Sequence, residues 1–225
     1  VVVPFNTAFA EQPATAYVED FLIGRFHPHT VIIGYDHRFG QGRSGDFHLL
    51  EKYAALHSFR LVEIPVRLVD EAAISSTRIR QALLDGQPEE AAKLLGYDYF
   101  FSGTVVTGNR LGRTIGYPTA NLQLQHADKL VPADGVYAVK LCLVTGGTKE
   151  LFGGMMNIGM RPTVDGKRRT IEVNIFDFDR DIYDRQLQVY CHRYLRGEQK
   201  FDGLEALKAQ LATDRLQALQ ALAAG

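Results

Sequence analysis

The sequence has little net charge, no long apolar run and few cysteines. Its formal net charge is −1 over 225 residues, whereas binding to a nucleic-acid backbone needs a clear basic surplus. No apolar run approaches the roughly 20 residues of a membrane-spanning helix. The first residues contain neither an initiator Met nor the basic segment of a signal peptide, so none is expected. We therefore predict that neither nucleic acid nor a membrane is a partner.

Cysteine is represented only by Cys142 and Cys191, which lie far apart in apolar segments. This placement is typical of buried free thiols, rather than of a disulfide, a metal pair or a nucleophile. Such thiols fit a reducing compartment, and we expect a cytoplasmic protein. The seven histidines show no spacing typical of a zinc site.

The first part of the chain shows alternating strand and helix patterns, which predict an α/β, Rossmann-like arrangement. The expected strands cover residues 1–3, 31–34 and 61–65, and the expected helices cover 15–23, 46–56, 76–86 and 88–96. The run at 31–34 is rich in β-branched residues, so we expect it to be buried on both faces. Ligands of open α/β sheets bind beyond the carboxyl ends of strands, which makes the loop at 35–45, with Asp36, a candidate site.

A second candidate site lies at the helix predicted to start near Ser75 or Ser76. Free N–H groups at a helix start favour an anion, and Ser76, Thr77 and Arg80 are the candidate contacts. The alternative is an ordinary N-cap, which is the commonest role of Ser or Thr at such a position.

After Gly96 the pattern changes to short strands with few helices between them, which predicts a barrel or a sandwich. Five strands are expected, at residues 99–107, 135–144, 150–158, 170–177 and 186–195. The last element is an amphipathic helix. Asp202 and Glu205 give it the spacing of a capping box. Its expected apolar face consists of Leu204, Leu207, Leu211, Leu216, Leu219 and Leu222.

The stretch from residue 103 to 121 is the strongest candidate for chemistry. Its glycines allow the backbone to approach a ligand closely and to present N–H groups to phosphate oxygens. After Pro118, the oxygens of Thr119 and Asn121 face one side of an extended chain, an arrangement that suits Mg²⁺. The alternative is a hairpin loop and a proline turn without a ligand. The glycines are Gly103, Gly108, Gly112 and Gly116.

Two charged residues further along the chain are also candidates. Glu172 alternates with Ile171 and Val173, so it faces away from them; it is either a solvated strand residue or a carboxylate in a pocket that accepts a proton from a substrate hydroxyl. Arg161 lies in a second Gly/Pro loop, where it either neutralises phosphate charge or is an ordinary surface arginine.

Residues from about 98 to 220 resemble the riboflavin kinase domain of the bacterial bifunctional riboflavin kinase/FAD synthetase family. Five segments carry this resemblance, in the order and at the spacing of the family. They are Gly112-Arg-Thr-Ile-Gly-Tyr-Pro-Thr-Ala-Asn121, Asp134-Gly-Val-Tyr-Ala138, Asn157-Ile-Gly-Met-Arg-Pro-Thr163, Glu172-Val-Asn-Ile175 and Leu195-Arg-Gly-Glu-Gln-Lys-Phe201.

The resemblance implies a Greek-key β-barrel with a C-terminal helix at residues 97–225, which phosphorylates riboflavin to FMN with Mg²⁺ and ATP. It implies that Thr119 and Asn121 hold Mg²⁺, that the loop from Gly103 to Gly116 covers the ATP phosphates, and that Glu172 activates the hydroxyl. Arg113 and Arg161 are implied phosphate or flap contacts. The turn from Arg196 to Phe201 and the final helix are expected to hold the isoalloxazine ring.

Residues 1–96 resemble the second half of the adenylyltransferase domain of the same family. The resemblance rests on Ile33-Gly-Tyr-Asp-His-Arg-Phe-Gly40 and Ile74-Ser-Ser-Thr-Arg-Ile-Arg80. It implies transfer of AMP to FMN. The His-x-Gly-His motif of that site does not occur in this sequence, so we expect FAD synthesis only in an intact protein that contains it. A non-catalytic flavin- or nucleotide-binding module remains the alternative from another class, and the oligomeric state is left open.

Overall fold

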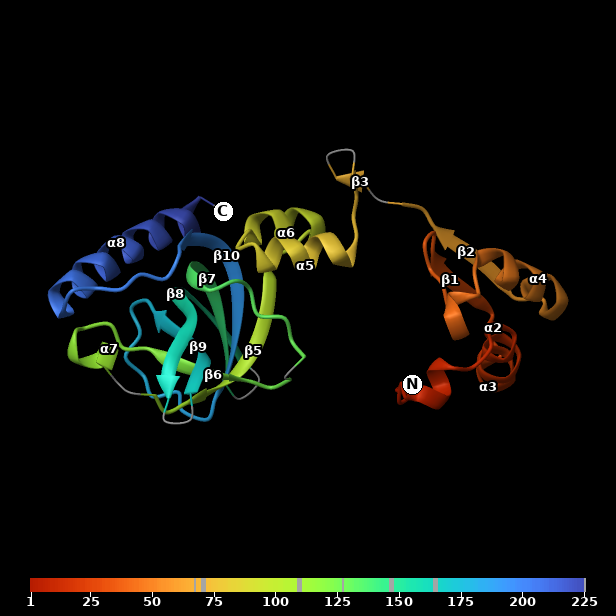
Figure 1. Cartoon of the computed structure of the whole chain (residues 1–225), viewed down its shortest axis with the longest axis horizontal. Helices are drawn as coiled ribbons and strands as arrows, with labels where there is room; N and C mark the ends of the chain where they lie inside the picture. The colour runs from red at the N-terminus through yellow and green to blue at the C-terminus, as the bar shows by residue number, and fades with distance from the viewer. Residues whose placement is uncertain are drawn as a thin grey trace. The chain divides into compact units, whose positions relative to one another are not determined.

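The computed structural model describes residues 1–66, 68–69, 72–108, 111–126, 128–145, 148–163 and 166–224. Asn109 and Arg110 of the glycine-rich stretch lie outside the described residues. The chain forms two compact units, Val1–Ala73 and Ile74–Gly225. Each unit is described by itself (Figure 1).

The first unit has a two-stranded parallel sheet with helices packed on it. Strand β1 (Thr30–Gly34) pairs in parallel with β2 (Arg60–Ile64), so that Thr30 faces Arg60. Ile33 packs with Val18 and Leu50 in the core of this unit. The other elements are α1 (Thr7–Ala10), α2 (Ala14–Ala16), the π-helix η1 (Tyr17–Ile23), α3 (Gly24–Phe26), the 3₁₀ helix η2 (Gln41–Arg43), α4 (Phe47–His57), β3 (Leu68–Val69) and β4 (Ala72–Ala73).

Two predictions for this unit are wrong. Val1–Val3 is not a strand, because among the described residues no strand pairs with it, and Val1 and Val2 are exposed. Strand β1 is not buried on both faces: Ile33 is 8% exposed but Ile32 is 61% exposed. The described helices cover only the face of this sheet that carries Ile33. The helix predicted at 46–56 is confirmed as α4, and Asp46 is its N-cap, since the Asp46 carboxylate accepts from the Leu49 N–H at 3.0 Å.

The second unit is built around a closed six-stranded antiparallel barrel of order β10-β5-β6-β9-β8-β7. Its strands are β5 (Tyr99–Val106), β6 (Ala120–Leu124), β7 (Gly135–Thr145), β8 (Thr148–Thr163), β9 (Gly166–Ile175) and β10 (Gln186–Arg196), and the short helix α7 (Leu111–Thr114) precedes β6. Strands β7, β8 and β9 are consecutive hairpins and β10 returns beside β7, which is Greek-key order. The predicted barrel is confirmed. Sequence patterns missed β6, because its run of five residues follows a proline turn.

Two helices, α5 (Ser76–Leu84) and α6 (Pro88–Leu95), pack against the barrel, where Leu83 and Ala91 contact Tyr99 and Leu130. The sequence resemblance predicts that these helices belong to the first domain, with a boundary at residue 96. By contacts they belong to the unit that contains the barrel. That boundary, as a domain boundary, stays a prediction.

The C-terminal helix α8 (Leu204–Ala223) lies on the outside of the barrel against β7, β8 and β10 (Figure 1). Its predicted capping box is wrong: Gly203 is the N-cap, and no side chain caps the helix. The predicted leucine face is correct only in part, since Leu207, Leu211 and Leu222 are half-buried and Leu211 and Leu222 pack against the core. The fully buried residues of the helix are Asp214, Ala218 and Ala221, whereas Leu204, Leu216 and Leu219 are 51%, 58% and 41% exposed. Small residues let the helix approach the sheet closely.

Candidate functional site

The candidate site forms where β6, β9 and β8 lie side by side on the outer surface of the barrel. In the strand register, Asn121 of β6 pairs with Glu172 of β9, and Glu172 pairs with Asn157 of β8. Residues directly opposite each other in antiparallel strands have neighbouring side chains on one face. The fold therefore places the carboxylate of Glu172 between two amides. The adjacent positions, Ile171 and Val173, face the barrel core.

The glycines before β6 lie close to the row of facing side chains formed by Asn121, Glu172 and Asn157. A Cβ on Gly108 would lie 2.1 Å from the amide nitrogen of Asn121, and a Cβ on Gly112 would lie 2.2 Å from the carbonyl oxygen of Tyr117. A side chain at position 108 would therefore displace the Asn121 side chain, and one at position 112 would displace the backbone just before Thr119. Gly116 has φ +85°, a conformation that favours glycine. Gly103 is different, since it is buried within β5, so the loop begins only after Val106.

Asn174 fixes the start of β6 from the neighbouring strand. It is 5% exposed, and its amide Nδ2 donates to the carbonyl oxygen of Pro118 at 2.7 Å. Its Oδ1 is buried and has no hydrogen-bond partner among the residues that the structure describes. An unpaired buried acceptor is costly in a folded protein. The residue immediately after Pro118 is Thr119, so Asn174 fixes the backbone next to one of the two predicted metal ligands.

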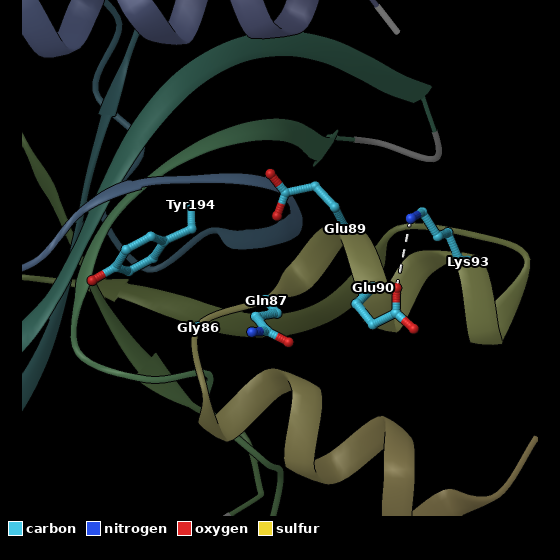
Figure 2. A pocket seen from close by; sticks show the side chains of 6 residues that line it. All are labelled: Gly86, Gln87, Glu89, Glu90, Lys93 and Tyr194. Carbon is cyan, nitrogen blue, oxygen red and sulfur yellow. Dashed lines mark ion pairs between the residues drawn. The ribbon is translucent and has the colours of Figure 1, made fainter.

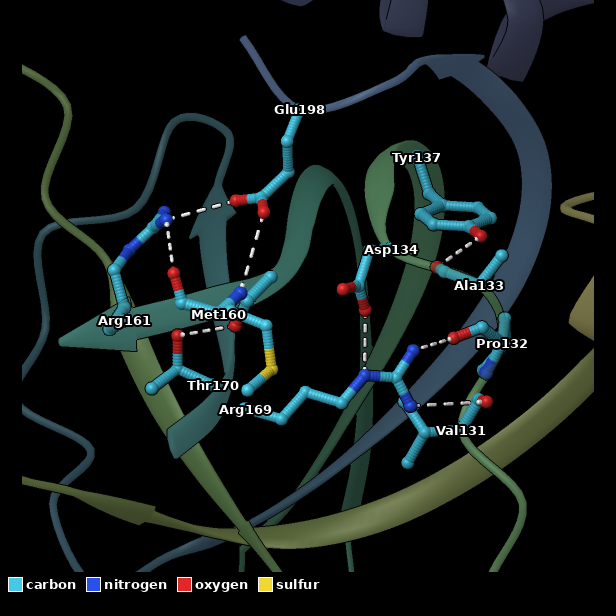
Figure 3. A network of polar contacts seen from close by, with 11 residues as sticks. Val131, Pro132, Ala133, Asp134, Tyr137, Met160, Arg161, Arg169, Thr170 and Glu198 are labelled. Carbon is cyan, nitrogen blue, oxygen red and sulfur yellow. Dashed lines mark hydrogen bonds and ion pairs between the residues drawn. The ribbon is translucent and has the colours of Figure 1, made fainter. Parts of the chain in front are cut away.

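Arg161 brings a positive charge to Glu172. Its Nε lies 3.6 Å from Glu172 Oε1, and its Nη1 donates to Glu198 Oε1 at 2.9 Å. The Glu172 side chain is 27% exposed, so it is partly buried and ion-paired rather than freely solvated. Figure 3 shows Arg161, Met160 and Glu198 converging from β8 and from the turn that follows β10.

The turn after β10 is attached to α8 by a buried ion pair. Arg196 Nε donates to Asp214 Oδ1 at 2.8 Å and Arg196 Nη2 to Asp214 Oδ2 at 2.6 Å. Asp214 is fully buried, and Gln210 also donates to it at 2.8 Å. Phe201 lies beneath the Arg196 guanidinium, 5.7 Å from the ring centroid. This network fixes both ends of the turn that carries Glu198.

The other predicted residues are not part of this row. Arg113 is exposed on α7. Asp36 is exposed in the first unit, while Ser76, Thr77 and Arg80 are exposed on α5 in the second unit. Ser75 rather than Ser76 is the N-cap of α5, and it accepts from the Arg78 N–H at 3.3 Å. The adenylyltransferase candidates thus lie in different units.

A separate cavity of about 610 Å³ lies between the α5–α6 connection and β10 (Figure 2). None of the predicted site residues lines it. Two of its charges pair with each other, since Lys93 Nζ lies 3.6 Å from Glu90 Oε2. Its lining residues are Gly86, Gln87, Glu89, Glu90, Lys93 and Tyr194. This cavity is therefore not the site that the motifs predict.

Sequence analysis missed the contacts of Glu198 and Asn174. Both residues stand inside segments that carried the family resemblance, but a single sequence does not reveal that Glu198 reaches back to β8. The signal for Asn174 was its position two residues after Glu172, which places both side chains on one face of a strand.

Comparisons with known proteins show the family to which the chain belongs. The family model described as riboflavin kinase matches residues 95–222, and the one described as FAD synthetase matches residues 1–78. The chain is 40% identical over 215 residues to the bifunctional riboflavin kinase/FMN adenylyltransferase of Haemophilus influenzae. It is 41% identical over 216 residues to the protein of the same name from Escherichia coli K12. These matches cover 95% and 96% of the chain, which spans 68% and 67% of the two relatives.

A solved structure from Streptococcus pneumoniae, described as a macrolide-efflux protein, has a TM-score of 0.81. It is 38% identical, and the match covers 94% of this chain and 66% of that one. Among the described residues, none of the helices is long and apolar enough to cross a membrane. The family resemblance seen in the motifs is confirmed: this chain belongs to the bifunctional riboflavin kinase/FMN adenylyltransferase family, and its barrel is the riboflavin kinase domain.

Proposed function

We propose that the barrel unit transfers the γ-phosphoryl group of ATP to the terminal ribityl hydroxyl of riboflavin, giving FMN and ADP. The observation that carries the proposal is the pairing of Asn121 with Glu172 across β6 and β9. A candidate ligand for the nucleotide side of the reaction and a candidate base thereby share one face. Phosphoryl transfer depends mainly on positioning and charge neutralisation, which such a site supplies.

In this proposal Glu172 is the general base. Its carboxylate takes the proton of the ribityl hydroxyl while that oxygen forms a bond to the γ-phosphorus. The bond from the γ-phosphorus to the bridging oxygen breaks, and ADP leaves with its electron pair. Arg161, held next to Glu172, neutralises charge on the transferred group.

The residues present fit a magnesium ion. Thr119 and Asn121 offer a hydroxyl and an amide carbonyl, which are the hard oxygen ligands that Mg²⁺ prefers, and phosphate oxygens commonly complete such a site. Asn174 supports the fit, because its side-chain amide holds the carbonyl of Pro118, the residue directly before Thr119. When bound, Mg²⁺ would neutralise phosphate charge. Thr119 and Asn121 would hold it.

The glycine-rich segment is proposed to cover the ATP phosphates. The close fit of Gly108 and Gly112 supports this role, because their backbone lies directly against the segment that carries Thr119 and Asn121. The turn from Arg196 to Phe201 is proposed to contact the isoalloxazine ring. ATP and riboflavin are the proposed partners, and a cytoplasmic location belongs to the same proposal, supported by two buried free cysteines.

Adenylylation of FMN to FAD is a proposal for the whole protein. Its support is the FAD synthetase match over residues 1–78, with Asp36, Ser76, Thr77 and Arg80 as candidate contacts. The His-x-Gly-His motif does not occur in this sequence. We therefore expect the polypeptide of this sequence to make FMN without making FAD.

The test is to incubate this polypeptide with riboflavin, ATP and Mg²⁺ and to separate riboflavin, FMN and FAD by chromatography. FMN as the sole product is the expected result. If the polypeptide binds riboflavin in the presence of Mg-ATP but does not convert it, the result would instead favour a non-catalytic flavin-binding module. FAD among the products would contradict the expectation for residues 1–78.

A further inference from the structure

Glu198 reaches across from the turn after β10 to the end of β8. One carboxylate oxygen, Oε1, accepts from Arg161 Nη1 at 2.9 Å, and the other, Oε2, accepts from the Met160 N–H at 3.4 Å. Arg161 in turn lies 3.6 Å from Glu172. Figure 3 shows the Glu198 carboxylate directed at both Arg161 and Met160.

Gly159 provides the space for this carboxylate. A Cβ on Gly159 would lie 1.9 Å from Glu198 Oε1 and 2.1 Å from its carboxyl carbon. Real Cβ atoms essentially never approach other heavy atoms so closely, so any side chain at this position would expel Glu198. Gly159 does not have a positive φ, so the requirement for glycine here is one of space rather than of backbone conformation.

The turn that carries Glu198 is not free to adjust. Arg196, two residues before Glu198, forms a bidentate ion pair with the buried Asp214. Its Nη1 also donates to the Gly197 carbonyl at 2.9 Å. The backbone of Glu198 is therefore held in place, and its carboxylate bonds to residues of strand β8. A side chain held at both ends in this way can fix the position of the Arg161 guanidinium.

We propose that Glu198 is a positioning residue for the phosphoryl transfer, because it holds the Arg161 guanidinium beside Glu172. The absence of a side chain at Gly159 leaves the space for the Glu198 carboxylate. The inference rests on the proposed kinase function. Arg161 is a long side chain with 42% of its surface exposed, and an unrestrained arginine samples many rotamers. Because a charge assists transfer only where the transferred group lies, loss of this restraint lowers turnover.

Five variants, one of them a control, test the proposal. Glu198→Ala removes the carboxylate, Gly159→Ala expels it, and the double variant does both. The matched control is Glu150→Ala, which removes a carboxylate of β8 of similar exposure whose ion-pair partner is Arg180, not Arg161. Each single variant should lower kcat by roughly 10- to 100-fold, as misplacement of a catalytic contact does, with much smaller changes in KM for ATP and riboflavin. The control Glu150→Ala should have the kcat of the wild type.

The double variant is the decisive one. Once Glu198 is alanine, the clash at Gly159 no longer exists, so the double variant should have the kcat of Glu198→Ala alone. Glu198→Gln keeps an acceptor for Arg161 and should restore most of kcat. Effects that multiply in the double variant, or a Glu198→Ala enzyme with wild-type kcat, would overturn the proposal.

Melting temperatures of all variants keep the test separate from misfolding. If Gly159→Ala unfolds, the comparison of Glu198→Ala with Glu198→Gln still decides. If the wild-type chain makes no FMN, the proposed function fails. If the wild type makes FMN and the variants have the same kcat as the wild type, only the positioning role fails.

Discussion

The buried ion pair between Arg196 and Asp214 predicts a large and specific loss of stability. Asp214 is fully buried and Arg196 is 15% exposed, so Asp214→Ala leaves a nearly buried guanidinium without its carboxylate. Removing one partner of a buried pair costs about 3–5 kcal/mol. For a unit of this size 1 kcal/mol corresponds to roughly 2–4 °C, so the melting temperature should fall by about 6–20 °C.

The assay is thermal unfolding followed by calorimetry, with Asp202→Ala as the matched control. Asp202 has the sequence position of a capping residue but does not cap α8, so its replacement should change stability by less than about 0.5 kcal/mol. Combining Asp214→Leu with Arg196→Met should recover most of the loss, because it removes the unpaired charge. Asp214→Ala with the stability of the control would refute this reasoning. If Asp202→Ala lost about 1 kcal/mol of stability, Asp202 would be shown to cap α8 after all.

Three further predictions concern the site and the core. Glu172→Gln should lower FMN formation by roughly 10²–10⁴-fold and leave nucleotide binding intact, as loss of a general base does; near-normal turnover would contradict its role. Asn121→Ala should impair use of Mg-ATP far more than riboflavin binding, and Gly108→Ala should reproduce this by displacing Asn121; equal losses in both bindings would argue against a metal role. Cys142 and Cys191 should react with a thiol reagent only after unfolding. Burial raises the pKa of the Cys191 thiol, so this thiol stays neutral in the folded protein. In the unfolded chain a thiol ionises at about pH 8.5, so the stability of the fold should decline as the pH rises above that value. Rapid labelling of both native thiols would contradict this.

Much of the fold is predictable from local sequence. Apolar alternation identified five of the six barrel strands, and Gly96, with φ +82°, ends α6 as expected. The failures concern residues whose environment is set by distant parts of the chain. The leucines of α8 gave a regular pattern, but the helix buries Ala218 and Ala221 because small side chains permit close packing on the sheet. Ile32 looked like a core residue and is exposed.

The site shows the same division. The segment from Gly108 to Asn121 and the position of Glu172 were visible as motifs, but their proximity depends on the pairing of β6 with β9, and β6 was not predicted. The contact of Glu198 with Arg161 joins residues on separate elements, and its geometric requirement at Gly159 appears only when a Cβ is placed there. Tertiary contacts of this kind leave no periodic signal in a single sequence.

The most direct test of the central claim is to follow the γ-phosphate itself. The chain would be supplied with γ-labelled ATP, Mg²⁺ and riboflavin, and the label would be measured in the flavin product together with ADP and pyrophosphate. The account predicts labelled FMN and one ADP for each FMN, with both lost in Glu172→Gln. Unlabelled flavin, or pyrophosphate in place of ADP, would contradict the assignment of a kinase site to the barrel.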